Sequence, residues 1–149
     1  MKFEEVIFTQ KAYHHKPTFL PTRATAKSAG HDFFLKEDIT IKPGKAVFQY
    51  TDVKCKLNRD EVLLLFVRSS IGIKKHLMLA NGTGVIDADY YNNPDNDGNI
   101  GLALYNYGTE PVTLAEGTRV MQGVTVDYQI AENDNAMGNR SGGFGSTGR

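Results

Sequence analysis

The chain has 149 residues, of which 40% are hydrophobic and 23% are charged, and this composition suits one globular domain with one core. Its 17 basic and 17 acidic residues give a net charge of +0, which argues against a duplex nucleic acid as partner. The longest apolar run is too short to span a bilayer and the single cysteine cannot form an internal disulfide, so we expect a cytoplasmic protein that does not bind a membrane.

Short runs of β-forming residues, separated by Gly, Pro, Asn and Asp, recur along the chain and predict an all-β sandwich or barrel. The expected strands lie at 3–9, 31–35, 39–41, 47–50, 53–57, 62–67, 77–79, 100–104, 112–114 and 119–128. Residues 62–67 are apolar on both faces, which predicts a central strand covered on both sides. A short helix is expected only at 69–76. The Asn, Asp, Pro and Gly residues at 92–99 predict an exposed loop.

The glycine-rich end of the chain differs from the rest. Residues 131–149 show no hydrophobic periodicity and predict a flexible C-terminal arm, which leaves residues 1–130 as the core domain. Glycines and hydroxyl groups in such a segment can approach an anion, an arginine can pair with phosphate, and a lone Phe can stack on a base. The residues of the arm that suit these tasks are Arg140, Phe144, Gly145, Ser146 and Thr147. A mobile terminal linker would also explain the composition.

Residues 84–90 read Gly-Val-Ile-Asp-Ala-Asp-Tyr and follow turn residues at 81–84. This pattern predicts a hairpin whose returning strand carries two acids. In an extended chain Asp87 and Asp89 point to the same side, while Tyr90 points to the other. The two acids indicate either a site or a solvated strand end.

Three further polar positions carry open alternatives. Arg68, Ser69 and Ser70 follow the apolar run and would either face a ligand or cap the short helix. Asp32 would hold a metal-bound water or cap a turn. Gln122 would join a site or form an interstrand hydrogen bond.

Taken in order, five stretches resemble the five motifs of the trimeric all-β dUTP pyrophosphatases, the dUTPase family. Residues 29–32, Ala-Gly-His-Asp, are similar to A-G-Y-D, and residues 68–70 are similar to R-S-G. Residues 81–90 resemble N-x-x-G-x-I-D-x-D-Y, and residues 117–122 resemble G-D-R-x-x-Q. Residues 140–148 resemble R-G-x-G-G-F-G-S-T-G. The motifs extend over most of the chain and keep the family order.

The resemblance implies a single-domain, distorted jelly-roll-like β-barrel that hydrolyses dUTP to dUMP and pyrophosphate. It implies Mg²⁺ held mainly by the triphosphate, and a homotrimer with shared active sites in which the arm of one chain closes over the pocket of another. Asp87 matches the base that activates water, and Asp32 matches an outer-shell contact to Mg²⁺ through water. The residues that match the uracil and deoxyribose site are Asn81, Gly84, Val85, Ile86, Tyr90 and Phe144. The residues that match phosphate contacts are Arg68, Ser69, Ser70, Gln122, Arg140, Gly145, Ser146 and Thr147.

The sequence departs from the family pattern at four places. His31 replaces Tyr, Ser70 replaces Gly, Thr118 replaces Asp, and Arg140 lies four residues before Phe144 instead of five.

The sequence also has to be compared with two functions other than hydrolysis. The related dCTP deaminases carry a Glu where this chain has Ala103, which argues against deamination. A nucleotide-responsive regulatory protein is the third hypothesis, with residues 92–99 as the surface for a protein partner or as an inert insertion.

Overall fold

Antiparallel β-strands make up most of the regular structure in the computed structural model, which describes residues 1–140 and 142–143. The strands are β1 Lys2–Glu5, β2 Thr22–Arg23, β3 His31–Phe34, β4 Ile39–Ile41, β5 Ala46–Tyr50, β6 Val53–Lys56, β7 Glu61–Val67, β8 Leu77–Leu79, β9 Gly84–Ile86, β10 Gly101–Asn106, β11 Val112–Leu114 and β12 Arg119–Asp127. The expected short helix is η2, Ser70–Lys74, and two three-residue turns of 3₁₀ helix, η1 Phe8–Gln10 and η3 Ala88–Tyr90, were not anticipated. The predicted all-β class is confirmed. None of the helices in the described ranges is long and apolar enough to cross a membrane.

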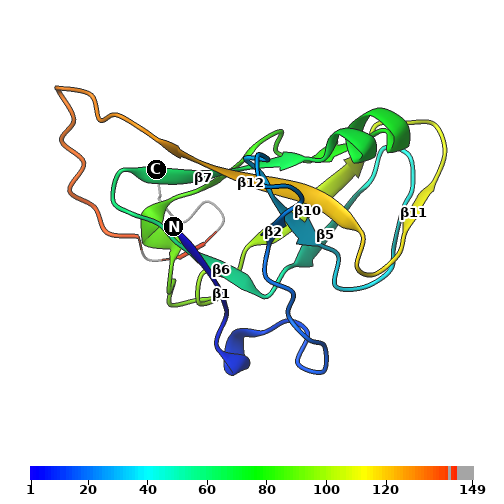
Figure 1. The fold of residues 1–149 in the computed structure, drawn as a ribbon, viewed down its shortest axis with the longest axis horizontal. Helices are drawn as coiled ribbons and strands as arrows, with labels where there is room; N and C mark the ends of the chain where they lie inside the picture. The colour runs from blue at the N-terminus through cyan, green and yellow to red at the C-terminus, as the bar shows by residue number, and fades with distance from the viewer. Residues whose placement is uncertain (141, 144–149) are drawn as a thin grey trace.

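The strands form four sheets. The largest has the order β2-β3-β12-β7-β9, and a three-stranded sheet has the order β5-β10-β8. The pairs β1-β6 and β11-β4 complete the fold. β12 crosses the molecule and pairs with β3 on one side and β7 on the other (Figure 1).

One core joins these sheets. Its buried side chains alternate along β7, β8 and β10, as expected for strands with one covered face. The core members on these strands and on β12 include Leu63, Leu65, Leu77, Leu79, Leu102, Leu104 and Met121. A register shift between Arg119 and Met121 places Val120 and Met121 both in the core. Regular alternation, which would put Arg119 and Met121 on one side, is therefore wrong here.

In the single chain the apolar strand β7 is covered on one face and only partly, at Val62, on the other. Leu63 and Leu65 are buried, whereas Leu64 is half-buried and Phe66 is exposed. The prediction of a strand covered on both sides is wrong for the single chain, because the periodicity of a sequence does not show what covers an apolar face.

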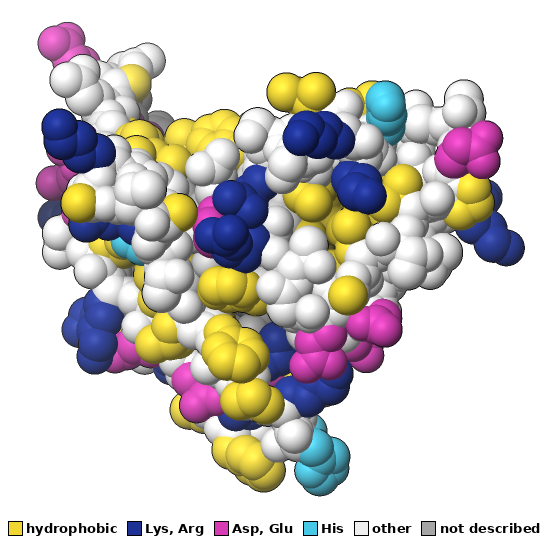
Figure 2. Space-filling model, turned by 45° about the vertical axis from the view of Figure 1, so that its right-hand side comes forward, with side chains coloured by type: hydrophobic (Ala, Val, Ile, Leu, Met, Phe, Trp, Pro, Cys, Tyr) yellow, Lys and Arg dark blue, Asp and Glu magenta, His cyan; other side chains and the backbone are white. Residues whose placement is uncertain are grey.

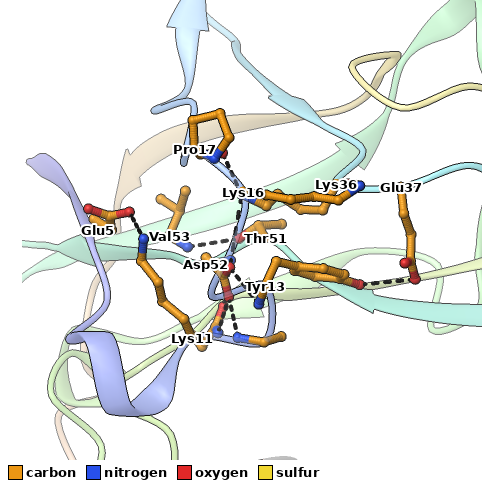
Figure 3. A network of polar contacts seen from close by, with 12 residues as sticks. Glu5, Lys11, Tyr13, Lys16, Pro17, Lys36, Glu37, Thr51, Asp52 and Val53 are labelled. Atoms are coloured by element: carbon orange, nitrogen blue, oxygen red, sulfur yellow. Dashed lines mark hydrogen bonds and ion pairs between the residues drawn. The ribbon is translucent and has the colours of Figure 1, made fainter.

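A polar network inside the molecule fixes the N-terminal segment (Figure 3). The carboxylate of Asp52 is fully buried and accepts hydrogen bonds from the backbone N–H groups of Ala12 and Tyr13, at 2.7 and 3.1 Å. The Lys36 ammonium lies 3.9 Å from the same carboxylate. Asp52 also exchanges two hydrogen bonds with Asn99, so this network reaches the segment that follows Tyr90.

The segment 92–99 packs against the protein rather than standing out as an exposed loop. Asn93, Asp97 and Asn99 are buried, while Pro94 and Asp95 are exposed. The prediction of an exposed loop is therefore wrong for about half of the segment. Asn93 accepts a backbone N–H within the segment, whereas Asp97 and Asn99 bond to Lys54 and Asp52 outside it, so most of these buried polar groups have partners.

The C-terminal segment leaves the sheet after Asp127 and has no regular structure as far as Arg140. Figure 1 shows it extending away from the end of β12 and then returning to the body of the molecule. Arg140 is the first residue of this return that is not exposed.

Candidate active site

A pocket of about 220 Å³ opens where the two larger sheets meet. The five-stranded sheet contributes Leu65 and Met121 together with the whole of β9, and the three-stranded sheet contributes Leu79 and residues 101–103. Its polar lining comes from Asn81, Asp87, Tyr90 and Arg140. An apolar slot with a few polar groups at its mouth is typical of a small-molecule site.

β9 forms one wall of the pocket and lies at the edge of its sheet. Its only strand partner in the described structure is β7, with Gly84 opposite Leu65. The prediction of a hairpin is wrong, because β8 and β9 belong to different sheets and the turn at Asn81-Gly82 connects them. The other backbone edge of β9 is left to pair with a flat polar ligand.

Gly84 is needed for this wall. A Cβ at Gly84 would lie 3.0 Å from both Cβ and Cδ1 of Leu65, closer than side chains normally pack. The glycine therefore lets β9 lie directly on β7. The slot beside β9 takes its shape from this close approach.

Asp87 follows β9 directly and Asp89 lies within η3, and both carboxylates bind Arg140. Nη2 of Arg140 lies 2.5 Å from Oδ2 of Asp87, and its Nε lies 2.8 Å from Oδ1 of Asp89. Asp87 does not cap η3 with its side chain, so its carboxylate faces the pocket mouth. The two acids converge on one cation, although the extended chain ends at Asp87 and Asp89 lies within η3.

Tyr90 closes the pocket at the other end of η3. Its side chain is buried, and burial raises the pKa of its hydroxyl. The guanidinium of Arg140 lies 5.8 Å from the centre of the Tyr90 ring. Tyr90 thus presents a fixed aromatic edge to the pocket.

A second polar cluster lies on the five-stranded sheet, away from the pocket lining. Asp32 is buried, with Nε of Arg68 3.0 Å and Nη1 of Arg119 3.3 Å from its carboxylate. Gln122 lies opposite Asp32 in the register, and a Cβ at Gly30 would come within 2.4 Å of Oε1 of Gln122. This face of the sheet is opposite to the one that carries Leu65 and Met121 into the pocket.

The predicted site residues therefore fall into two groups in one chain. Those placed together in the pocket are Asn81, Gly84, Val85, Ile86, Asp87, Tyr90 and Arg140. Asp32, Arg68 and Gln122 belong to the second cluster, and Ser69 and Ser70 are exposed beside it at the start of η2. Ser69 makes no side-chain capping bond to η2, so that capping interpretation is wrong. Phe144, Gly145, Ser146 and Thr147 lie outside the described residues.

Sequence reasoning missed the apolar floor of the pocket. Leu65, Leu79, Leu102 and Met121 read as ordinary core residues, and Gly101 and Ala103 carry no chemical signal. Only the register between strands shows that they meet at β9. Arg119 was also missed as a partner of Asp32.

The described residues do not offer a cluster of His, Cys, Asp or Glu that could hold a metal ion alone. The arrangement instead suits an ion that arrives on a triphosphate, since Mg²⁺ keeps much of its water and binds few protein ligands. Asp32 gives one oxygen to each of two arginines, and each oxygen keeps a lone pair for a metal-bound water.

Comparison with known proteins identifies the family. The dUTPase family model matches residues 16–148. The chain is 42% identical over 131 residues to the deoxyuridine 5'-triphosphate nucleotidohydrolase of Lactococcus lactis, covering 87% of each sequence. It is 39% identical to a Streptococcus mutans dUTPase of known structure, with a TM-score of 0.77 and coverage of 89% of this chain and 100% of that one. The phage phi11 dUTPase, described with a structural Mg(II) ion, has the same fold at 24% identity and a TM-score of 0.68. With a family model that matches nearly its whole length and such relatives, the chain belongs to the dUTPase family.

Proposed function

We propose that this chain hydrolyses dUTP to dUMP and pyrophosphate at the pocket beside β9, with Asp87 as the base that activates water. The observation that carries the proposal is the meeting of a free strand edge and a carboxylate at one apolar slot. The strand edge can pair with a nucleobase, and the carboxylate beside it can activate water.

The recognition of uracil is assigned to the edge of β9. Uracil presents one N–H donor between two carbonyl acceptors, and an open strand edge offers alternating N–H and C=O groups that can pair with them. Asn81, at the start of the turn before β9, adds an amide that can donate and accept. Because Gly84 lies tightly on Leu65, a narrow slot of this kind would exclude a 5-methyl group and reject thymine.

The chemical step is assigned to Asp87, whose side chain keeps 51% of its exposure and can reach a water molecule at the pocket mouth. The water gives a proton to the carboxylate as its oxygen bonds to the α-phosphorus. The bridging P–O bond breaks, and pyrophosphate leaves with the bond electrons. General-base catalysis of this kind contributes about 10²–10⁴-fold.

The triphosphate is proposed to enter with Mg²⁺, which when bound neutralises charge on the phosphate oxygens. Arg140 at the pocket mouth is one cation for the phosphates. The second cluster supplies Arg68 and Gln122, with Ser69 and Ser70 beside them, and Asp32 orients Arg68 and can accept a metal-bound water. Residues 131–149 are proposed as an arm that closes over an active site, with Phe144 on the base and Gly145, Ser146 and Thr147 on the phosphates.

A homotrimer with shared sites is proposed to bring the two groups of residues together. The outward face of the three-stranded sheet is apolar and carries Phe48, Tyr50, Met78, Ala103 and Tyr105. Hydrophobic side chains reach the surface in several groups on the face drawn in Figure 2. Gly101 and Ala103 belong both to this sheet face and to the pocket lining, so a second chain placed here would border the pocket.

The arm differs in one respect from the closure in trans that the family resemblance implies. In the single chain Arg140 binds its own Asp87, so this part of the arm closes in cis. The arm therefore gives no support for shared sites. That proposal rests on the second cluster, which lies away from the pocket of its own chain.

The two alternative functions are less well supported. Ala103 lines the pocket where the deaminases have an acid, so a group for deamination is missing at that position. Residues 92–99 are engaged with the chain itself, which leaves mainly Asn92, Pro94 and Asp95 exposed for a protein partner. A reducing, cytoplasmic compartment is proposed because Cys55 is a free, buried thiol whose pKa is raised to about 12 by burial.

The test of the assignment is Asp87→Asn, with Asp89→Asn as the matched control for loss of charge at Arg140. We expect Asp87→Asn to bind dUTP within about threefold of the wild type in calorimetry and to lose about 10²–10⁴-fold in kcat. Asp89→Asn should keep kcat within about tenfold. Full turnover by Asp87→Asn, or equal losses in both variants, would show that Asp87 is not the base.

A further inference from the structure

The segment after η3 folds around a cation supplied by the chain itself. The Lys54 ammonium lies 2.8 Å from Oδ2 of Asp97, 2.7 Å from Oδ1 of Asn92 and 4.9 Å from the centre of the Tyr91 ring. The side chains of Lys54 and Asp97 are each only 9% exposed. Oδ2 of Asp97 also accepts the backbone N–H of Ile7 at 2.7 Å. Residues 91–99, which we call the asparagine loop, are therefore held from inside.

The asparagine loop turns back onto Tyr90. Gly98 has a φ of +77°, and a Cβ there would lie 2.5 Å from the backbone oxygen of Tyr90, so only glycine fits this approach. Oδ1 of Asn96 accepts the N–H of Gly98 at 3.0 Å, which closes the turn. The amide nitrogen of Asn96 is then directed at the Tyr90 side chain.

The loop holds the Tyr90 hydroxyl at two points. Nδ2 of Asn96 donates to the hydroxyl at 2.8 Å, and the hydroxyl donates to the backbone oxygen of Asn99 at 2.9 Å. Asn99 is itself fixed by its two hydrogen bonds with Asp52 in the core. The hydroxyl end of the ring is thus tied to the protein, while the ring lines the pocket. Neither contact involves a group that would touch the substrate.

We propose that Asn96 is a specificity-determining positioning residue, which fixes the Tyr90 ring where it leaves no space for a ribose 2′-hydroxyl and so sets the preference for dUTP over UTP. The inference rests on the proposed function, because Tyr90 lines the pocket proposed for dUTP and matches the uracil and deoxyribose site that the family resemblance implies. Steric exclusion of one hydroxyl group needs a wall that does not yield, since a shift of about 1 Å is enough to alter a bound geometry. An aromatic ring held only by apolar packing can tilt, whereas one held by two hydrogen bonds at its far end is constrained.

The test is the ratio of kcat/KM for dUTP to that for UTP, measured by pyrophosphate release. Asn96→Ala is expected to lower this ratio at least tenfold, mainly through a gain with UTP, with a thermal midpoint close to that of the wild type. Asp95→Ala is the matched control, because Asp95 lies in the same loop, is exposed, and makes no side-chain bond to the described residues. Its ratio should equal that of the wild type. A wild-type ratio retained by Asn96→Ala would overturn the inference.

A double-mutant cycle shows whether Asn96 acts through the hydroxyl. Tyr90→Phe removes the hydroxyl and should lower the ratio as Asn96→Ala does, and the double variant should show no further loss. Independent, additive losses would contradict the inference, and so would an unchanged ratio in Tyr90→Phe. If Asn96→Ala fails to fold, the Tyr90→Phe variant alone still tests the inference. A wild-type protein that releases no pyrophosphate from dUTP would overturn the proposed function itself. A variant that loses its preference for dUTP over UTP still releases pyrophosphate, so the two outcomes are distinct.

Discussion

Nη2 of Arg140 lies 2.5 Å from Oδ2 of Asp87, which joins the C-terminal arm to the proposed catalytic base of the same chain. The carboxylate and the guanidinium neutralise each other at the mouth of the pocket. An incoming triphosphate carries more negative charge than Asp87, so it can draw Arg140 away and leave the carboxylate free for water.

The first prediction concerns this pair. Arg140→Ala should lower kcat/KM for dUTP about tenfold or more, because a phosphate contact is lost, and change the free energy of unfolding by less than about 1 kcal/mol, because both partners reach solvent. Steady-state kinetics and urea unfolding measure the two effects. Arg59→Ala, at an exposed arginine, is the control and should change neither quantity. Unchanged kinetics in Arg140→Ala would remove Arg140 from the site.

The second prediction concerns the cation within the asparagine loop. Asp97→Asn leaves the buried Lys54 ammonium without its carboxylate, and breaking a buried pair on one side costs about 3–5 kcal/mol. We expect a loss of this size in urea unfolding. Asp95→Asn, in the exposed part of the loop, should cost less than about 0.5 kcal/mol. Equal stability of the two variants would show that the pair is not an anchor.

The third prediction concerns pH. Burial, followed by the charge of Arg23, lowers the pKa of His31 below its ordinary value of 6.5, and its Nδ1 has no hydrogen-bond partner in the described structure. Because the unfolded chain takes up this proton more readily, stability should be full above pH 6.5 and decline as the pH falls below it.

His31→Tyr, which restores the residue usual in the family, removes that titration. The decline in thermal midpoint between about pH 7 and pH 5 should therefore be smaller in His31→Tyr than in the wild type. Parallel curves for the two proteins would mean that His31 does not contribute to the pH dependence.

The fourth prediction concerns assembly. Phe48→Glu places a charge in the apolar face of the three-stranded sheet and should dissociate the trimer and reduce dUTP hydrolysis together. Phe8→Glu changes another exposed phenylalanine, which lies on η1 outside that sheet, and should stay trimeric and active. Light scattering after size exclusion reads the mass. A trimeric, active Phe48→Glu protein would place the interface elsewhere.

Local patterns in the sequence predicted much of this molecule, and they failed where tertiary contacts decide. The alternation at residues 102 and 104 identified β10, because every second side chain of this strand is buried. The bulge after Arg119 broke the same rule in β12, since one extra residue reverses which side chains face the core. The partner of β9 could not be read from the turn at Asn81-Gly82, because a turn shows that the chain reverses but not which strand it then joins.

The loop at 92–99 shows the same limit for polar residues. Its composition predicted exposure, yet Asp97 is buried because Lys54, distant in the sequence, brings an opposite charge to it. Asp87 and Tyr90, which the motif singles out, line the pocket, whereas the residues of its floor were not anticipated. Leu65 and Met121 meet β9 only in the folded sheet, and nothing in their own neighbourhood marks them.

The central claim is tested most directly by the products formed from dUTP, UTP, dTTP and dCTP with Mg²⁺, with pyrophosphate, phosphate and ammonia measured separately. The account predicts equal amounts of dUMP and pyrophosphate from dUTP, little reaction with UTP or dTTP, and no ammonia from dCTP. Release of phosphate in place of pyrophosphate, ammonia from dCTP, or equal turnover of dUTP and dTTP would contradict it.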